Sequence, residues 1–144
     1  MKVVFDIEPV AQGRPRYSRR PFMHAYDPKP TKMFKNRLNG MAAKYMAEQG
    51  MKPFDGPLLV DLIFYRSIQK SVSKKEHDRR KNKAVLPAVK PDVDNYIKSV
   101  LDAFNGAIWV DDNLICDLHA RKFYSDHPRI ELTVKNIKES DELN

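Results

Sequence analysis

The stretch that decides the fold is KPDVDNYIKSVLDAFNGAIWVDDNLI, residues 90–115. Apolar residues recur at helical spacing through 93–105 and fall on one side of a helical wheel, which predicts an amphipathic helix. Gly106 is a usual residue for ending such a helix. The apolar run 107–110 predicts a short strand, and after a turn the residues 114–124 predict a longer one. A helix that packs on a sheet is therefore expected here.

Farther out, alternating apolar residues predict three more strands, over residues 2–9, 57–65 and 129–137. Two more helices are predicted, over 31–49 with Thr31 as its cap and over 73–83 with Ser73 and Glu76 as a capping box. Five prolines within 9–30 predict an extended basic arm or loop. These elements predict one α/β (α+β) domain over residues 1–144, with a mixed sheet packed against two main helices.

Composition excludes several classes of protein. The chain has 144 residues, a net charge of +7 and one cysteine, Cys116, so an internal disulfide and a multi-cysteine zinc site are excluded. No apolar run approaches the roughly 18 residues that a membrane span requires. The start, MKVVFDIEPV, does not resemble a signal peptide. We therefore expect a cytoplasmic protein that does not act in a membrane.

The positive charge is concentrated in two segments. Residues 12–37 hold eight Lys and Arg against one Asp, and residues 66–83 hold eight against two acidic residues. The remainder of the chain is acidic overall. Clustered Lys and Arg neutralise phosphates and release counterions, which favours a nucleic acid as partner. The alternative is that both segments are merely solvated loops.

Three carboxylates are predicted to meet near the start of the 93–105 helix. Asp92 precedes the helix and Asp94 lies in its first turn. The helix rises about 17 Å from Asp94 to its end, and an extended return over 107–112 covers a similar length at about 3.3 Å per residue. If Gly106 reverses the chain, Asp112 comes back level with Asp94, with Lys98 one turn along the helix.

Such a cluster predicts a divalent-metal site. Carboxylates crowded together repel one another unless a cation lies between them, and an oxygen-only ligand set suits Mg²⁺ or Mn²⁺. In a protein that binds phosphates, this indicates metal-assisted phosphodiester hydrolysis, with Lys98 stabilising the charge of the transition state. The alternative is structural, because Asp92 is an ordinary N-cap and Asp94–Lys98 an ordinary surface ion pair.

The same stretch resembles the RusA family of Holliday-junction resolvases, bacterial and often phage-derived endodeoxyribonucleases. The resemblance rests on PDVDN at 91–95, Lys98, LDAFNG at 101–106 and WVDD at 109–112, and extends more weakly to GRPR at 13–16 and the 129–137 strand. It implies that Asp92, Asp94 and Asp112 bind the catalytic Mg²⁺ or Mn²⁺ and that Lys98 assists. It also implies a homodimer that makes paired nicks across a four-way DNA junction, in DNA recombination and repair.

Two further interpretations compete with this one: a non-catalytic module that binds branched DNA, and a metal nuclease that acts on flaps or forks. A full set of three carboxylates and a lysine favours an enzyme, because a binding module gains nothing from acids beside phosphate. The residues expected to contact DNA are cations of the two basic segments, namely Arg14, Arg16, Arg19, Arg20, Lys74, Lys75, Arg79 and Arg80.

Aromatic residues of the 9–30 segment, Tyr17, Phe22 and Tyr26, are interleaved with its arginines. They are suited either to stacking on bases exposed at a branch point or to anchoring the arm on the domain. Trp109 and Cys116 lie in apolar surroundings, and we expect both in the core. The four histidines are scattered, which argues against a histidine metal site.

Overall fold

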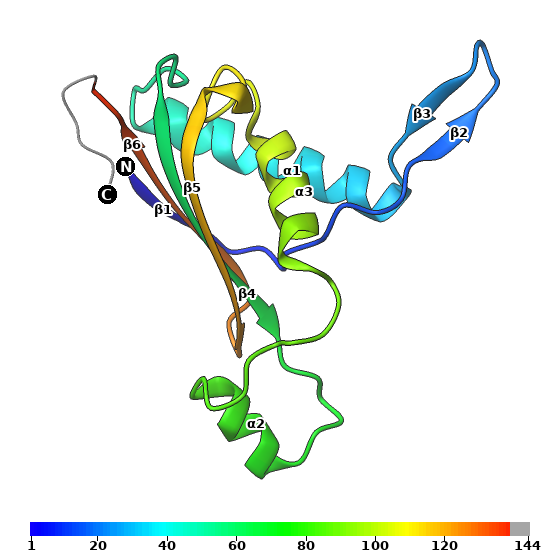
Figure 1. Ribbon diagram of the computed structural model, residues 1–144, viewed down its shortest axis with the longest axis vertical. Helices are drawn as coiled ribbons and strands as arrows, with labels where there is room; N and C mark the ends of the chain where they lie inside the picture. Colours follow the sequence, from blue (N-terminus) through cyan, green and yellow to red (C-terminus); the bar gives the residue numbers. More distant parts are fainter. Residues whose placement is uncertain (139–144) are drawn as a thin grey trace.

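The computed structural model describes residues 1–138. Four strands form its main sheet: β1 (Lys2–Phe5), β4 (Leu58–Ser67), β5 (Ile115–Ser125) and β6 (Arg129–Asn136). Their order is β1-β6-β4-β5 (Figure 1). β4 pairs antiparallel with β6 and parallel with β5, so the sheet is mixed, as the sequence predicts.

Helices α1 (Lys29–Glu48) and α3 (Val93–Phe104) pack on each other and on one face of this sheet (Figure 1). Every second residue of β4 from Leu58 to Phe64 is fully buried beneath them. Burying one such side chain stabilises the fold by about 1.5–3 kcal/mol. Because α3 is strongly amphipathic, its apolar side anchors the helix and leaves its polar side toward solvent.

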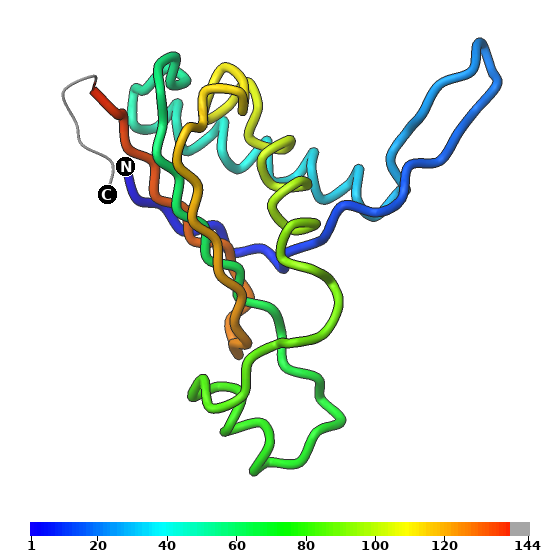
Figure 2. Tube along the Cα trace, in the orientation of Figure 1, coloured from blue at the N-terminus to red at the C-terminus, as the bar shows by residue number. Residues whose placement is uncertain are grey.

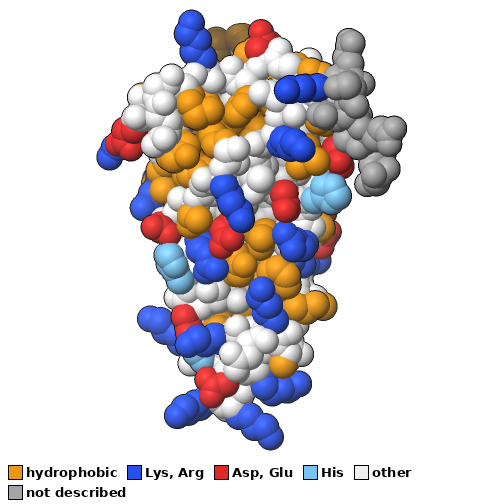
Figure 3. All heavy atoms as spheres, turned by 90° about the vertical axis from the view of Figure 1, so that its left-hand side faces the viewer, with side chains coloured by type: hydrophobic (Ala, Val, Ile, Leu, Met, Phe, Trp, Pro, Cys, Tyr) orange, Lys and Arg blue, Asp and Glu red, His pale blue; other side chains and the backbone are white. Residues whose placement is uncertain are grey.

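No helix among residues 1–138 covers the opposite face of the sheet. Figure 3 shows apolar side chains there, interrupted by charges of both signs. Several of these charges form ion pairs within the face, among them Asp61–Arg121 and Glu131–Arg129. Lys and Arg gather instead at the lower end of the view, around α2 (Lys74–Lys81).

α2 has no buried residue, and cations docked on aromatic rings hold it near the sheet. The Arg80 guanidinium lies 4.8 Å from the centre of the Tyr124 ring, and Lys83 Nζ lies 4.4 Å from that of Phe123. Such contacts contribute about 0.5–2 kcal/mol each. The Ser73 hydroxyl accepts a hydrogen bond from the Glu76 N–H, which confirms the predicted cap.

The predicted proline-rich arm contains two short strands. β2 (Arg16–Ser18) and β3 (His24–Tyr26) pair antiparallel with each other and form a sheet of their own. Figures 1 and 2 show this hairpin standing away from the rest of the molecule. The extended arm is therefore confirmed, with a hairpin that the prolines did not indicate.

Three local predictions were wrong. Thr31 is no cap, because α1 begins at Lys29 after Pro28; the Thr31 hydroxyl instead accepts from the Gly13 N–H at 3.3 Å. Residues 107–110 form a turn with isolated bridges rather than a strand. Cys116 is exposed, since it lies on the edge strand β5, whereas Trp109 is fully buried as expected.

Among residues 1–138, no helix is long and apolar enough to cross a membrane.

Candidate metal and nucleic-acid site

Two predicted ligands lie together at the N-terminal end of α3. Asp92 is the N-cap residue, yet its side chain makes no capping hydrogen bond; its backbone carbonyl accepts from the N–H groups of Asn95 and Tyr96. Asp94 follows in the first turn, and both residues are exposed. Two carboxylates are thus held toward solvent where a helix end is positively polarised.

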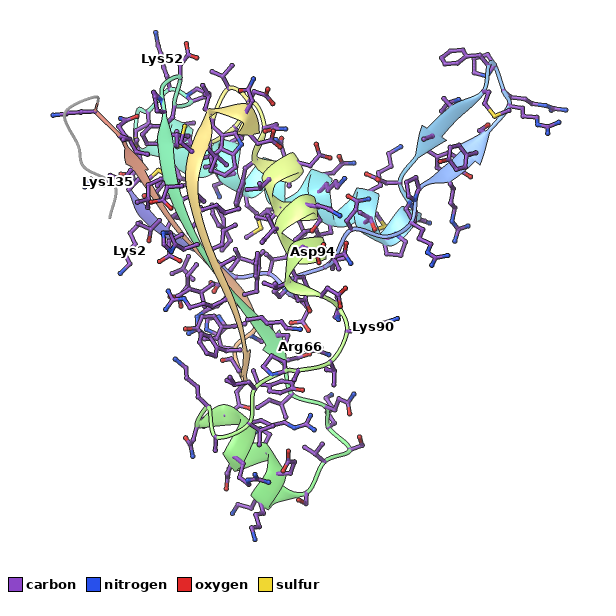
Figure 4. All side chains as sticks on the ribbon, viewed as in Figure 1. Lys2, Lys52, Arg66, Lys90, Asp94 and Lys135 are labelled. Atoms are coloured by element: carbon purple, nitrogen blue, oxygen red, sulfur yellow. The ribbon has the colours of Figure 1, made fainter. Side chains whose placement is uncertain are left out.

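The loop that leads into α3 is tied to the sheet by two cations. Arg66 at the end of β4 donates to the carbonyl oxygen of Lys90 at 2.9 Å. Lys122 of β5 donates to the carbonyls of Val89 and Pro91, each at 2.9 Å. Figure 4 shows Asp94 at this end of the helix, above Lys90 and Arg66. The sheet therefore sets the position of the Asp92 and Asp94 carboxylates.

Lys98 lies one turn farther along α3, as the sequence predicts. Its Nζ is 3.7 Å from a carboxylate oxygen of Asp94, and both side chains are 63% exposed. An ion pair this open adds little stability. The lysine is consequently free to move toward an incoming phosphate.

Asp112 is not brought to Asp92 and Asp94 within one chain. The N–H groups of Ala107 and Ile108 still donate to the Phe104 carbonyl, so the chain turns tightly after α3 instead of returning along it. The segment between α3 and β5, drawn in yellow in Figure 1, stays at the C-terminal end of α3. That end is about 15 Å along the helix from Asp94.

Asp112 begins the short helix η1 (Asp112–Leu114), where its N–H donates to the Asp111 carboxylate at 3.0 Å. Within residues 1–138, no group of three or more His, Cys, Asp or Glu side chains could hold a metal ion. The expected convergence of three carboxylates in one chain was therefore wrong, because it required the extended return that the tight turn replaces.

The root of the arm is bound directly to α3. The Gln12 N–H donates to the Asn95 carbonyl at 2.8 Å, and the Ser99 hydroxyl donates to the Val10 carbonyl. Gly13 is packed so closely that a Cβ there would lie 3.0 Å from Cγ of Pro28. The first turn of α3 and the start of the arm thus form one unit.

A half-buried lysine strengthens this connection. Lys35 of α1 lies 2.8 Å from Asp27 of the arm and 2.7 Å from Asp102 of α3, with 12% of its side chain exposed. Burial favours a lower pKa for Lys35, but hydrogen bonds to Asp102 and Asp27 outweigh it and raise that pKa. The hydrogen bond from Lys35 lowers the pKa of Asp27 despite partial burial. Lys35 and Asp27 are therefore both charged at neutral pH.

The predicted DNA-binding cations fall into two groups. Those of the arm, together with two lysines of α2, are exposed and form no ion pair with any residue among 1–138: Arg14, Arg16, Arg19, Arg20, Lys74 and Lys75. Arg79 and Arg80 instead both bind Glu76, each at 3.1 Å. Arg79 and Arg80 thus share a carboxylate partner within α2, whereas the cations of the first group have no such partner and can bind phosphates directly.

Sequence reasoning missed the positioning cation Lys122 and assigned Lys35 and Arg66 only to basic segments. Their partners are backbone carbonyls or carboxylates distant in the chain, and Lys122 lies 31 residues from Pro91. The spacing of neighbouring residues in the sequence does not predict contacts of this kind. The available signal was that Lys122 stands where the alternation of β5 would place an apolar residue, after Leu118 and Ala120.

The donor set at the start of α3 fits a hard divalent cation. Mg²⁺ usually takes one or two protein carboxylates and completes its shell with water and phosphate oxygens, and Asp92 and Asp94 offer two exposed carboxylates without a capping bond. A bound Mg²⁺ or Mn²⁺ would supply Lewis-acid polarisation of a phosphate. Lys98 and the exposed cations of the arm would hold that phosphate in place.

Comparison with known proteins agrees with this chemistry. The family model described as "Endodeoxyribonuclease RusA" matches residues 6–135. The chain is also 41% identical over 133 residues to the "Uncharacterized protein YqaN" of Bacillus subtilis (strain 168), covering 90% of this chain and 92% of that protein.

Proposed function

Because this chain belongs to the RusA family of endodeoxyribonucleases, we propose that it resolves four-way DNA junctions by paired, metal-dependent nicks. Endodeoxyribonuclease activity follows from the family; the choice of junction and the need for Mg²⁺ or Mn²⁺ are the proposal. The observation that carries it is the pair of exposed carboxylates, Asp92 and Asp94, beside a lysine and a cationic arm. Carboxylates beside a phosphate-binding surface would repel the phosphate unless a metal ion lay between them.

Each residue has a role in this proposal. Asp92 and Asp94 hold the metal, and Lys98 contacts the phosphate that gains charge in the transition state. Arg66 and Lys122 act as positioning residues, since they contact the backbone before Asp92 rather than the reacting atoms. The free cations of the arm and α2 bind the DNA backbone.

The third carboxylate is proposed to come from a second copy of the chain. Asp112 is separated from Asp94 by about the length of α3, roughly 15 Å, so one chain does not complete the ligand set. In a two-fold symmetric dimer, if Asp112 of one copy reaches Asp94 of the other, the reverse contact also forms. One interface thereby completes two sites, which matches the two strands that a junction resolvase cuts.

Cleavage of a synthetic four-way junction tests the proposal. The wild-type protein is expected to cut two opposed strands with Mg²⁺ and none in EDTA, and linear duplex of the same length should remain intact. Equal cleavage of a flap or fork substrate would identify a different nuclease. Junction binding without any cleavage under Mg²⁺ or Mn²⁺ would identify a non-catalytic module.

A further inference from the structure

We propose that the β2–β3 hairpin is a base-stacking arm that engages the bases exposed at the branch point of the DNA, where the continuous stack is interrupted. This inference rests on the proposed function and names how the branch is recognised. It is carried by three observations: an aromatic ladder on one face of the hairpin, a purely cationic surround, and a rigid connection to the helix that holds Asp94.

The ladder consists of Phe22, His24 and Tyr26. The Phe22 and His24 ring centres are 5.4 Å apart, and those of His24 and Tyr26 are 6.2 Å apart. His24 and Tyr26 are two apart on β3 and therefore share a face. The ring distance places Phe22 beside His24, so the three rings form a continuous stripe. Phe22 is 67% and Tyr26 45% exposed, which rules out the alternative that these rings anchor the arm on the domain.

Arginines border the ladder. Arg16 lies directly opposite Tyr26 in the hairpin and therefore on the same face, while Arg19 and Arg20 lie at the tip. Asp27, the one acidic residue of the 12–37 segment, is already bound to Lys35 and Gln12. Exposed rings among unpaired cations suit a ligand that has both flat apolar surfaces and negative charge. Nucleotides exposed at a branch point have both, because the base is flat and the phosphate is negatively charged.

The arm is placed relative to the candidate metal site by its root. The Gln12 N–H binds the Asn95 carbonyl, directly after Asp94, and Lys35 joins Asp27 to Asp102. A base held on the ladder would therefore lie at a set distance from the phosphate at Asp94. An arm of this kind selects branched DNA, because the stack of bases is interrupted at a branch point and continuous in linear duplex.

Another aromatic residue of the hairpin, outside the ladder, provides a matched control. Tyr17 is 71% exposed, but it pairs with Ala25 and so lies on the face opposite the ladder. The variants to compare are Phe22→Ala/Tyr26→Ala and Tyr17→Ala. All three positions are exposed on the arm, so the domain is expected to fold in each variant, and circular dichroism checks this.

The experiment combines each protein with two DNAs in EDTA: a four-way junction, and the same junction with abasic sites at the branch point. Either Phe22→Ala/Tyr26→Ala or the abasic sites should weaken binding about tenfold relative to the wild-type protein on the intact junction. The two changes together should weaken binding no more than either one alone. Tyr17→Ala should respond to abasic sites as the wild type does. This lack of additivity is the signature of direct contact between ring and base.

Independent, additive losses would overturn the inference, as would unchanged junction binding by Phe22→Ala/Tyr26→Ala. Loss of self-association in that variant during sedimentation would also overturn it, because the arm would then contact a second copy. Wild-type junction cleavage is measured in parallel with Mg²⁺. If the junction is cleaved but the binding losses are additive, the role of the arm is refuted and the proposed function stands. If the losses are not additive but no cleavage occurs, only the proposed function is refuted.

Discussion

The ammonium of Lys122 lies 2.9 Å from the carbonyl oxygen of Pro91, the residue immediately before Asp92. A side chain of the central part of β5 thereby holds the loop that carries a candidate metal ligand. Lys122 is half-buried and forms no ion pair with a carboxylate among residues 1–138; both of its hydrogen bonds go to backbone oxygens. Its role is to position the loop.

Lys122→Met should therefore lower the rate of junction cleavage about tenfold, because a displacement of about 1 Å at a reacting centre has a large effect on rate. Junction affinity in EDTA should change less than twofold. Lys122→Arg should recover part of the rate, since it keeps the donor and charge. Lys135→Met, an exposed position on β6, is the control. Equal rates in Lys122→Met and wild type would remove the positioning role.

Asp92→Asn, Asp94→Asn and Asp112→Asn should each abolish cleavage while junction binding survives or tightens, because each removes a ligand and a repulsive charge. Binding of Mn²⁺, followed by calorimetry, should weaken in the same variants. Lys98→Ala should lower cleavage far more than binding. Asp55→Asn, an exposed acid remote from α3 in the sequence, is the control. Wild-type cleavage in any of the three variants would exclude that residue as a ligand.

Mixing two inactive proteins tests whether the site is shared between copies. If Asp112 acts across a dimer, a mixed dimer of Asp94→Asn and Asp112→Asn chains contains one intact site and one doubly defective site. The mixture should recover nicking of one strand, although neither variant cuts alone. Sedimentation should give about twice 16.7 kDa. A monomer, or a mixture that stays inactive, would contradict the shared site.

The salt dependence of DNA affinity should distinguish unpaired arginines from those that already form ion pairs. Replacing Arg14, Arg16, Arg19 and Arg20 by Gln should flatten the slope of log affinity against log salt by about 3 to 4, at about 0.9 per phosphate contact. Arg79→Gln/Arg80→Gln should change the slope less, because both guanidinium groups already bind Glu76. Equal changes in the two slopes would show that the ion pairs do not restrain these arginines.

Lys35→Met should lower the free energy of unfolding at pH 7 by about 1–2 kcal/mol, since Asp27 and Asp102 lose a shared partner. The pKa of Asp27 is lowered by Lys35, so its contribution is present above its unfolded pKa and is lost as pH falls through the folded one. The difference between wild type and variant should shrink below about pH 4. Denaturant unfolding at pH 3 and pH 7 measures it, and a constant difference would contradict the assignment.

Local sequence by itself determined much of this protein. The helical spacing of apolar residues predicted α3 within one residue, and Gly106, with φ +80°, ends it where a left-handed conformation is needed. Ser73 and Glu76 predicted the start of α2. The position of Asp92 and Asp94 at one helix end followed as well. Each of these features depends on residues within a few positions of one another.

Only the tertiary structure decided what distant residues do together. The tight turn after Phe104 keeps Asp112 at the far end of α3, because backbone hydrogen bonds and the burial of Trp109 outweigh the strand preference of residues 107–110. The parallel pairing of β4 with β5 brings Lys122 to Pro91, and Lys35 joins the arm to α3. Such contacts depend on the packing of elements far apart in the chain, which no local pattern encodes.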